Sequence, residues 1–169
     1  MNPLMHTTSV PVFKQMLGGL GDILAKTEAH AAAKKIDPAV FLQARLFPDM
    51  FALSQQVQVA CDFAVGVSAR LAGVEVPVFD GKESSFADLQ ARIAKVVAFI
   101  EGLPASQFEG SAVREIVLRP GTPKEKRLLG QAYLSSYGLP QFFFHVSTAY
   151  AILRHHGVEI GKKDYMGAY

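Results

Sequence analysis

Three side chains in the sequence have the types and spacing needed for metal or acid–base chemistry. His145 lies within the apolar run Phe142–Val146, and on a helical wheel it borders the apolar side of its helix. Gln58 and Asp62 are four residues apart, so they lie on the same stripe of another helix. Imidazole, amide and carboxylate groups all bind divalent metals. We therefore expect a metal site in which His145, Asp62 and Gln58 face a cleft between these two helices.

The same three side chains also have purely structural interpretations. A single histidine beside an apolar face often hydrogen-bonds to a neighbouring helix. Gln58 and Asp62 both lie about a third of a turn from the centre of the apolar face of their helix. This position favours solvent exposure or hydrogen bonding for Asp62, and the sequence leaves both interpretations open.

Other reactive side chains give weaker indications of chemistry. Cys61 falls on the apolar side of its helix, where a free cysteine acts as a small hydrophobe. The adjacent His155 and His156 point about 100° apart on a helix, so they cannot chelate one ion. Three tyrosines could offer phenols to a pocket, although such tyrosines are more typical of a core or an interface: Tyr133, Tyr137 and Tyr150. The common catalytic motifs are absent, and no catalytic residue is predicted.

Apolar residues recur every three or four positions in four long segments, which predicts four long helices. The predicted segments run from Val10 to Ala31, Asp49 to Ala72, Ser85 to Leu103 and Gln131 to His156. Gly138 and Pro140 should kink or split the last of them. We expect an all-α fold, a four-helix bundle that fills one domain over residues 1–169.

Local signals predict how these segments begin, end and connect. Ser9 is expected to cap the first helix, Asp37 a short helix to Arg45, and Ser85 with Asp88 to form a capping box. The stretch from Glu115 to Leu129 predicts a small β-hairpin that turns at Pro120-Gly121. After Gly157 too few residues remain for another packed element, and the C-terminal tail is expected to pack loosely.

The composition limits the classes of function. The 169 residues are 50% hydrophobic and carry a net charge of only +2, which is too small a basic excess for a nucleic-acid-binding protein. One cysteine excludes an intrachain disulfide and fits a reducing compartment. The sequence shows no secretion signal and no membrane-spanning segment, so we expect a cytoplasmic protein with no membrane contact.

Several segments together resemble an uncharacterised bacterial domain-of-unknown-function family among the DinB/YfiT-like metalloenzymes. They begin with Val10-Pro11-Val12-Phe13, continue with Ala44-Arg45-Leu46, Pro48-Asp49-Met50 and Gln58-Val59-Ala60-Cys61-Asp62-Phe63, and end with Phe143-Phe144-His145-Val146 and Tyr150-Ala151-Ile152-Leu153-Arg154. The resemblance implies a four-helix bundle with a long crossover connection, often a homodimer. It also implies a nickel or zinc ion on three histidines, and in some members thiol-dependent transferase or hydrolase activity.

The chain departs from the metal-binding pattern of that superfamily. His145 matches the first of two histidines on the last helix, but Ala149 stands at the second position. The second helix offers Gln58 and Asp62 and no histidine. One imidazole and one carboxylate would hold a transition metal weakly, since a catalytic zinc usually has three protein ligands.

Two hypotheses about function follow. The chain is a divalent-metal-dependent enzyme with a degenerate site that acts on a small molecule, or it is a non-catalytic homodimeric helical module without metal. The second hypothesis places an apolar helix face with Phe142 and Phe143 at the interface. The sequence does not decide whether the protein is an enzyme.

Overall fold

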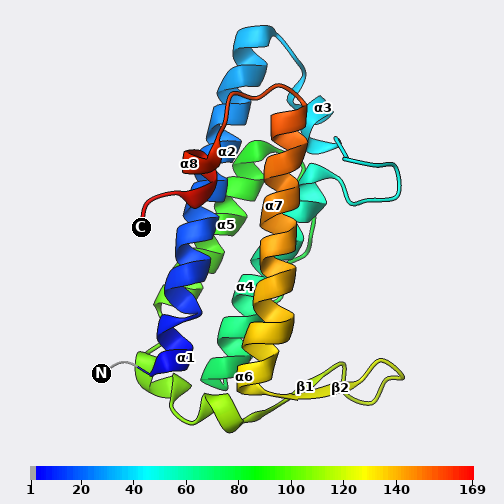
Figure 1. Ribbon diagram of the computed structural model, residues 1–169. Helices are drawn as coiled ribbons and strands as arrows, with labels where there is room; N and C mark the ends of the chain where they lie inside the picture. The colour runs from blue at the N-terminus through cyan, green and yellow to red at the C-terminus, as the bar shows by residue number, and fades with distance from the viewer. Residues whose placement is uncertain (1–2) are drawn as a thin grey trace.

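Four long helices run side by side along one axis in the computed structural model, which describes residues 3–169 (Figure 1). They are α2 (Val10–Lys34), α4 (Leu53–Ala72), α5 (Phe86–Glu101) and α7 (Leu139–His155). Helix α4 packs against α5 and α7, and α2 packs against the same two helices from the other side. The predicted four-helix bundle is therefore confirmed. None of the helices in residues 3–169 combines the length and the apolar character needed to cross a membrane.

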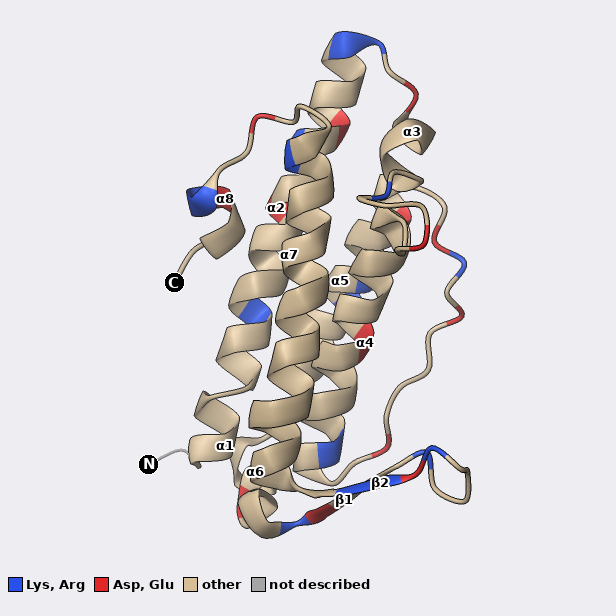
Figure 2. Cartoon of the chain, turned by 45° about the vertical axis from the view of Figure 1, so that its right-hand side comes forward, with Lys and Arg blue, Asp and Glu red and all other residues tan. Residues whose placement is uncertain are grey.

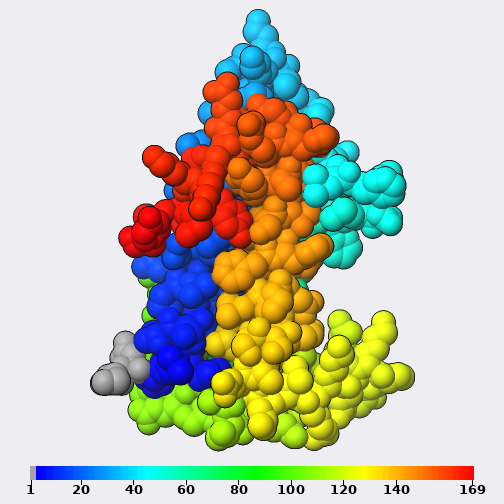
Figure 3. Space-filling view, viewed as in Figure 1, coloured from blue at the N-terminus to red at the C-terminus, as the bar shows by residue number. Residues whose placement is uncertain are grey.

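Short elements connect the helices and close the ends of the bundle. The short helices are α1 (Leu4–Thr7), α3 (Pro38–Leu42), η1 (Ala105–Phe108), η2 (Ser111–Val113), α6 (Gly130–Ala132), η3 (Tyr133–Gly138) and α8 (Lys162–Met166). Strands β1 (Glu115–Leu118) and β2 (Lys126–Leu129) pair antiparallel, with Glu115 opposite Leu129. The predicted hairpin is confirmed, and it projects sideways from the lower end of the molecule in the space-filling view (Figure 3).

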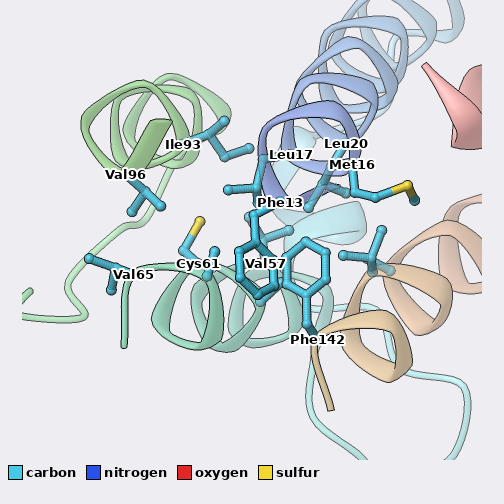
Figure 4. Packing of buried hydrophobic residues seen from close by; sticks show 14 of the residues in the cluster. Phe13, Met16, Leu17, Leu20, Val57, Cys61, Val65, Ile93, Val96 and Phe142 are labelled. Carbon is cyan, nitrogen blue, oxygen red and sulfur yellow. The ribbon is translucent and has the colours of Figure 1, made fainter. Parts of the chain in front are cut away.

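The core lies where the apolar faces of all four long helices meet (Figure 4). Phe13 of α2 and Phe142 of α7 are fully buried, and their rings pack edge to face with centroids 4.8 Å apart. Burying a side chain of this size stabilises the fold by about 1.5–3 kcal/mol. The prediction that Phe142 lies at an exposed interface is wrong, because this ring is on the side of α7 that faces α2.

Local signals set some helix ends and fail at others. The Ser85–Asp88 capping box and the Asp37 cap are both present. Ser9 does not cap α2, because its hydroxyl donates to the Met5 carbonyl of the preceding turn. Helix α4 begins at Leu53, later than predicted, because the Leu53 N–H donates to the Ala44 carbonyl and holds the segment before it in a loop.

The last predicted helix is split, as Gly138 and Pro140 indicated. A π-helical segment, η3, lies between α6 and α7. Pro140 has no N–H to donate to the carbonyl four residues earlier, which favours an irregular turn here. Gly138 lets η3 approach α4 closely, because a Cβ at this position would lie 2.6 Å from Cγ2 of Val67.

The C-terminal segment contacts the bundle, so the prediction that no packed element follows Gly157 is wrong, whereas the last residue, Tyr169, is 97% exposed, as expected of a loose tail. Helix α8 lies against α2, and both lie on the same side of the molecule in Figure 1. A Cβ on Gly19 would lie 3.0 Å from the Asp164 carbonyl oxygen, so the glycine permits this contact. The Gln15 side chain donates to the Met166 carbonyl at 2.9 Å, and Lys26 pairs with Asp164. These contacts depend on tertiary structure and leave no periodic signal in a five-residue helix.

Candidate functional site

Two of the three predicted site residues belong to one charged cluster between α4 and α5. The Arg92 guanidinium reaches from α5 and donates from Nη2 to Asp62 Oδ1 at 2.5 Å and from Nη1 to Glu83 Oε1 at 2.7 Å. Gln58 donates from Nε2 to Glu83 Oε2 at 2.9 Å. The Arg92 side chain is only 3% exposed, and its guanidinium lies 4.6 Å from the centre of the Phe79 ring. We call these four polar residues the Arg92 cluster.

Burial and hydrogen bonding act in opposite directions on the carboxylates of the Arg92 cluster. Burial raises the pKa of Asp62, and the neighbouring Arg92 opposes that shift. Burial also works against ionisation of Glu83, but hydrogen bonds from Arg92, its own backbone and Gln58 outweigh it and lower the pKa of Glu83. The Arg92 cluster therefore favours the ionised form of Glu83 more strongly than that of Asp62.

His145 belongs to a different network. Its Nδ1 lies 2.7 Å from Gln56 Oε1, and the Gln56 amide nitrogen donates to the Phe51 carbonyl at 3.2 Å. The second bond fixes the amide orientation, so Nδ1 carries the proton and Nε2 carries the lone pair. Burial lowers the pKa of His145, which favours this neutral form. The rings of Phe51 and Phe63 lie nearly parallel to the imidazole, with centroids 6.4 and 5.9 Å away.

The structure therefore brings Gln58 and Asp62 into one cluster and leaves His145 outside it. Each of the three side chains already has a protein partner: Glu83 for Gln58, Arg92 for Asp62 and Gln56 for His145. Within residues 3–169 no group of three or more His, Cys, Asp or Glu side chains lies close enough to hold one ion. As they stand, the three residues do not fit a shared metal site, and metal binding by them stays a prediction.

The other candidate side chains have structural surroundings. Cys61 is fully buried in the core, and burial raises the pKa of its thiol to about 12. This agrees with its interpretation as a small hydrophobe. His156 lies at the end of α7, where its Nδ1 contacts the Ile152 carbonyl at 2.7 Å.

A hollow that the sequence did not indicate lies between α4, η3 and the end of β1. Its volume is about 210 Å³, and its lining residues come from these elements and the loop after β1: Asp62, Phe63, Gly66, Val67, Arg70, Leu118, Arg119, Tyr133 and Tyr137. Arg70 donates from Nη1 to the Gly66 carbonyl at 3.0 Å and to the Tyr133 hydroxyl at 3.2 Å. The break at Gly138 and the two tyrosines before it were the available signals, but nothing in the sequence placed Arg70 beside them.

Comparison with known proteins agrees with this fold over almost the whole chain. Residues 5–166 match the family model described as a domain of unknown function, DUF1993. A crystal structure of a DinB family member protein from Shewanella denitrificans is 41% identical and covers 98% of this chain and 93% of its own, with a TM-score of 0.92. No curated protein matches the chain at a significant level.

Proposed function

The chain belongs to the DUF1993 family of DinB-like proteins, and we propose that it is a binding module for a small molecule that works without a resident metal ion. The observation that supports this proposal is the position of Arg92. Its guanidinium is buried and hydrogen-bonded to both Asp62 and Glu83. A cation of the protein itself therefore already neutralises the carboxylate that a metal would need.

Electrostatics argue against a metal ion on Asp62. An ion ligated by this carboxylate would lie roughly 4 Å from the Arg92 guanidinium, and at an effective dielectric constant near 20 two unit charges at that distance repel by about 4 kcal/mol. A divalent ion doubles this repulsion to about 8 kcal/mol before solvent around the half-exposed Asp62 screens it, so Arg92 offsets part of the attraction that Asp62 and Glu83 would offer the ion. Moving Arg92 away would leave a buried cation without its partners, which is also costly.

The metal-dependent enzyme remains the rival proposal, and His145 is the residue that favours it. Metal-binding histidines usually donate a hydrogen bond from the N–H of one ring nitrogen to a fixed acceptor, as the His145 Nδ1–H does to Gln56 Oε1. The lone pair on Nε2 is then free to bind an ion. A single imidazole binds weakly, so under this proposal nickel or zinc would need further ligands from water or substrate, or from rearranged Asp62 and Gln58 side chains.

Elemental analysis of untagged protein separates the two proposals. The metal-free proposal expects substoichiometric nickel, zinc, iron and manganese, both as purified and after soaking with each metal followed by desalting. Stoichiometric metal that disappears in His145→Ala would overturn it. The variant His155→Ala is the matched control, because it removes an imidazole from the same helix at an exposed position.

Homodimer formation stays a prediction, and the structure changes the residues that could support it. Phe142 is buried, whereas Phe51 and Phe144 beside His145 are 44% and 54% exposed. Under the proposal of an interaction module, a second copy would cover these two rings. Light scattering across a range of concentrations should then show twice the monomer mass for the wild type and less for Phe144→Asp.

A control variant and a contradicting outcome complete the light-scattering experiment. The variant Leu129→Asp removes a comparably exposed apolar side chain from the hairpin and should keep the wild-type mass. A monomer mass for the wild type at every concentration would contradict the dimer.

A further inference from the structure

Two hollows meet beside Tyr137 at the lower end of the bundle. The first is the 210 Å³ hollow between α4, η3 and β1. The second, about 360 Å³, follows the hairpin and is lined by Leu118, Arg119, Lys124, Lys126, Tyr137 and Gln141. They share Leu118, Arg119 and Tyr137, so they form one continuous surface that we call the Tyr137 site.

The Tyr137 site carries an excess of positive charge. Its cations are Arg70, Arg119, Lys124 and Lys126, and none of them forms a salt bridge with any acidic group of residues 3–169. Its single acidic residue, Asp62, is hydrogen-bonded to Arg92 on the other side. Figure 2 shows basic segments of the hairpin beside the lower end of α4. Uncompensated cations around a hollow attract anions.

Arg70 is held in a fixed position within the site. Its Nη1 donates to the Gly66 carbonyl and to the hydroxyl of Tyr133, a residue that is only 1% exposed. Within residues 3–169 the remaining guanidinium N–H groups of Arg70 have no hydrogen-bond acceptor. Planar guanidinium donors that are fixed in this way suit the paired oxygens of a carboxylate or phosphate.

The other walls of the site are apolar and aromatic. Phe63, Val67 and Leu118 line the first hollow, and the rings of Tyr133 and Tyr137 stack with centroids 5.7 Å apart and an angle of 23°. The ring of Phe63 packs against that of Tyr137, with centroids 6.0 Å apart. These surfaces fit a small planar apolar group, since aromatic rings favour stacked or edge-to-face contacts.

The backbone around the site is unusual in two places. Arg119 adopts a positive φ of 50°, a conformation that costs free energy in residues other than glycine. Tyr133 and Tyr137 both lie in the π-helical segment η3, and π-helical turns occur frequently at functional sites. Both irregularities place a lining side chain of the same site.

From these contacts we propose that the Tyr137 site binds a small organic anion, with a planar apolar body against Phe63 and Tyr137 and a carboxylate or phosphate monoester near Arg70 and Arg119. Pockets for drug-sized ligands usually measure about 300–1,000 Å³, so the 210 Å³ inner hollow limits the ligand to a smaller body. This inference names the ligand class of the proposed binding function, and rests on that proposal only in assuming that the bundle binds a small molecule.

Calorimetric titration of metal-depleted protein tests the inference with four probes. Benzoate and phenyl phosphate should bind, and the tighter of the two identifies the anionic group. Neutral benzamide, which has the same ring, should bind at least about tenfold more weakly because it cannot form charge-assisted hydrogen bonds. Inorganic phosphate should also bind more weakly, because it has no apolar body. Affinity for the two aromatic anions should fall as salt is raised.

Two variants of the hairpin region decide which residues carry the binding. Arg119→Gln should lower the affinity for benzoate and phenyl phosphate about tenfold. Arg127→Gln removes the same charge from the same hairpin, but Arg127 pairs with Glu115 and Glu125 outside the site, so binding should stay at the wild-type level. Circular dichroism melts of both variants confirm that the fold is retained.

Several results would overturn the inference. It fails if no aromatic anion binds, if benzamide binds as tightly as benzoate, or if Arg119→Gln and Arg127→Gln behave alike. Binding of inorganic phosphate as tight as that of phenyl phosphate would also reject it. Because the protein is depleted of metal beforehand, these outcomes are independent of the elemental analysis that tests the metal-free proposal.

Discussion

Arg92 of α5 contacts helix α4 and Arg70 belongs to α4, but the two arginines differ in the charge of their surroundings. Arg92 is buried between two carboxylates, Asp62 and Glu83, and its cation is fully compensated. Arg70 contacts only neutral oxygens, those of Gly66 and Tyr133, and belongs to the Tyr137 site, which carries three further cations. A compensated buried arginine joins two helices, whereas an uncompensated arginine at a hollow is prepared for an anion from outside. The difference favours a structural role for Arg92, and it supports the proposal that Arg70 binds a ligand.

The largest expected effect is on stability, from the substitution Arg92→Met. Methionine keeps most of the buried apolar volume, but Glu83 loses its counter-charge while its side chain is only 11% exposed. Breaking a buried ion pair on one side costs about 3–5 kcal/mol, and we expect the lower end because Asp62 remains half exposed. Urea denaturation measures the change in the free energy of unfolding.

The matched control is Arg127→Met on the hairpin, where Arg127 also contacts two carboxylates but is exposed to solvent. Exposed ion pairs contribute little, so this variant should unfold at nearly the wild-type urea concentration. Equal losses in the two variants would mean that burial of Arg92 does not give the cluster its structural role.

The next effect concerns the close approach that shapes the Tyr137 site. In Gly138→Ala the new Cβ would lie 2.6 Å from Val67 Cγ2 and 3.3 Å from the Tyr133 carbonyl oxygen. Overpacking of this kind typically costs about 1–3 kcal/mol, and the movement of η3 away from α4 should also weaken anion binding. Thermal melts and the benzoate titration measure the two consequences.

A glycine elsewhere in the bundle supplies the control for that substitution. A Cβ on Gly18 of α2 meets no atom within 4 Å, so Gly18→Ala adds only helix propensity. It should stabilise the protein by about 0.5–1 kcal/mol and leave the titration unchanged. Stabilisation by Gly138→Ala as well would show that α4 and η3 are not tightly packed.

The sequence predicted the helical scaffold better than it predicted the candidate site. Ser85 and Asp88 form their capping box within four residues, and the break at Gly138 and Pro140 is equally local. Such local signals can be recognised in the sequence without knowledge of the fold. Helix α8 depends on a glycine of α2 more than 140 residues away, and no local pattern could reveal it.

The candidate site escaped prediction for the same reason. Gln58 and Asp62 were correctly placed on one stripe of a helix, but their partners Glu83 and Arg92 come from the connector and the next long helix. His145 was correctly assigned to the border of an apolar face, and its partner Gln56 lies 89 residues away. Side-chain type predicted which groups could do chemistry. The tertiary structure determined which of these groups already have a hydrogen-bond partner within the protein.

The smallest expected effect is a difference in acid stability that reports on the Arg92 cluster alone. The pKa of Glu83 in the folded protein lies below its ordinary value of 4.5, because the hydrogen bond from Arg92 and other bonds outweigh burial. The unfolded chain therefore binds a proton at higher pH than the folded chain does. Glu83 contributes stability that is complete above pH 4.5 and is lost as the pH falls through its lower folded pKa.

The variant Glu83→Gln removes that titration and leaves Asp62 to pair with Arg92. Its free energy of unfolding should be lower than that of the wild type at neutral pH, and the gap should narrow as the pH falls below 4.5. Urea denaturation at a series of pH values measures the gap. If both proteins lose stability in parallel, Arg92 does not hold Glu83 ionised. Glu83 would then not compensate the charge of Arg92, and the difference in charge compensation between Arg92 and Arg70 would be smaller.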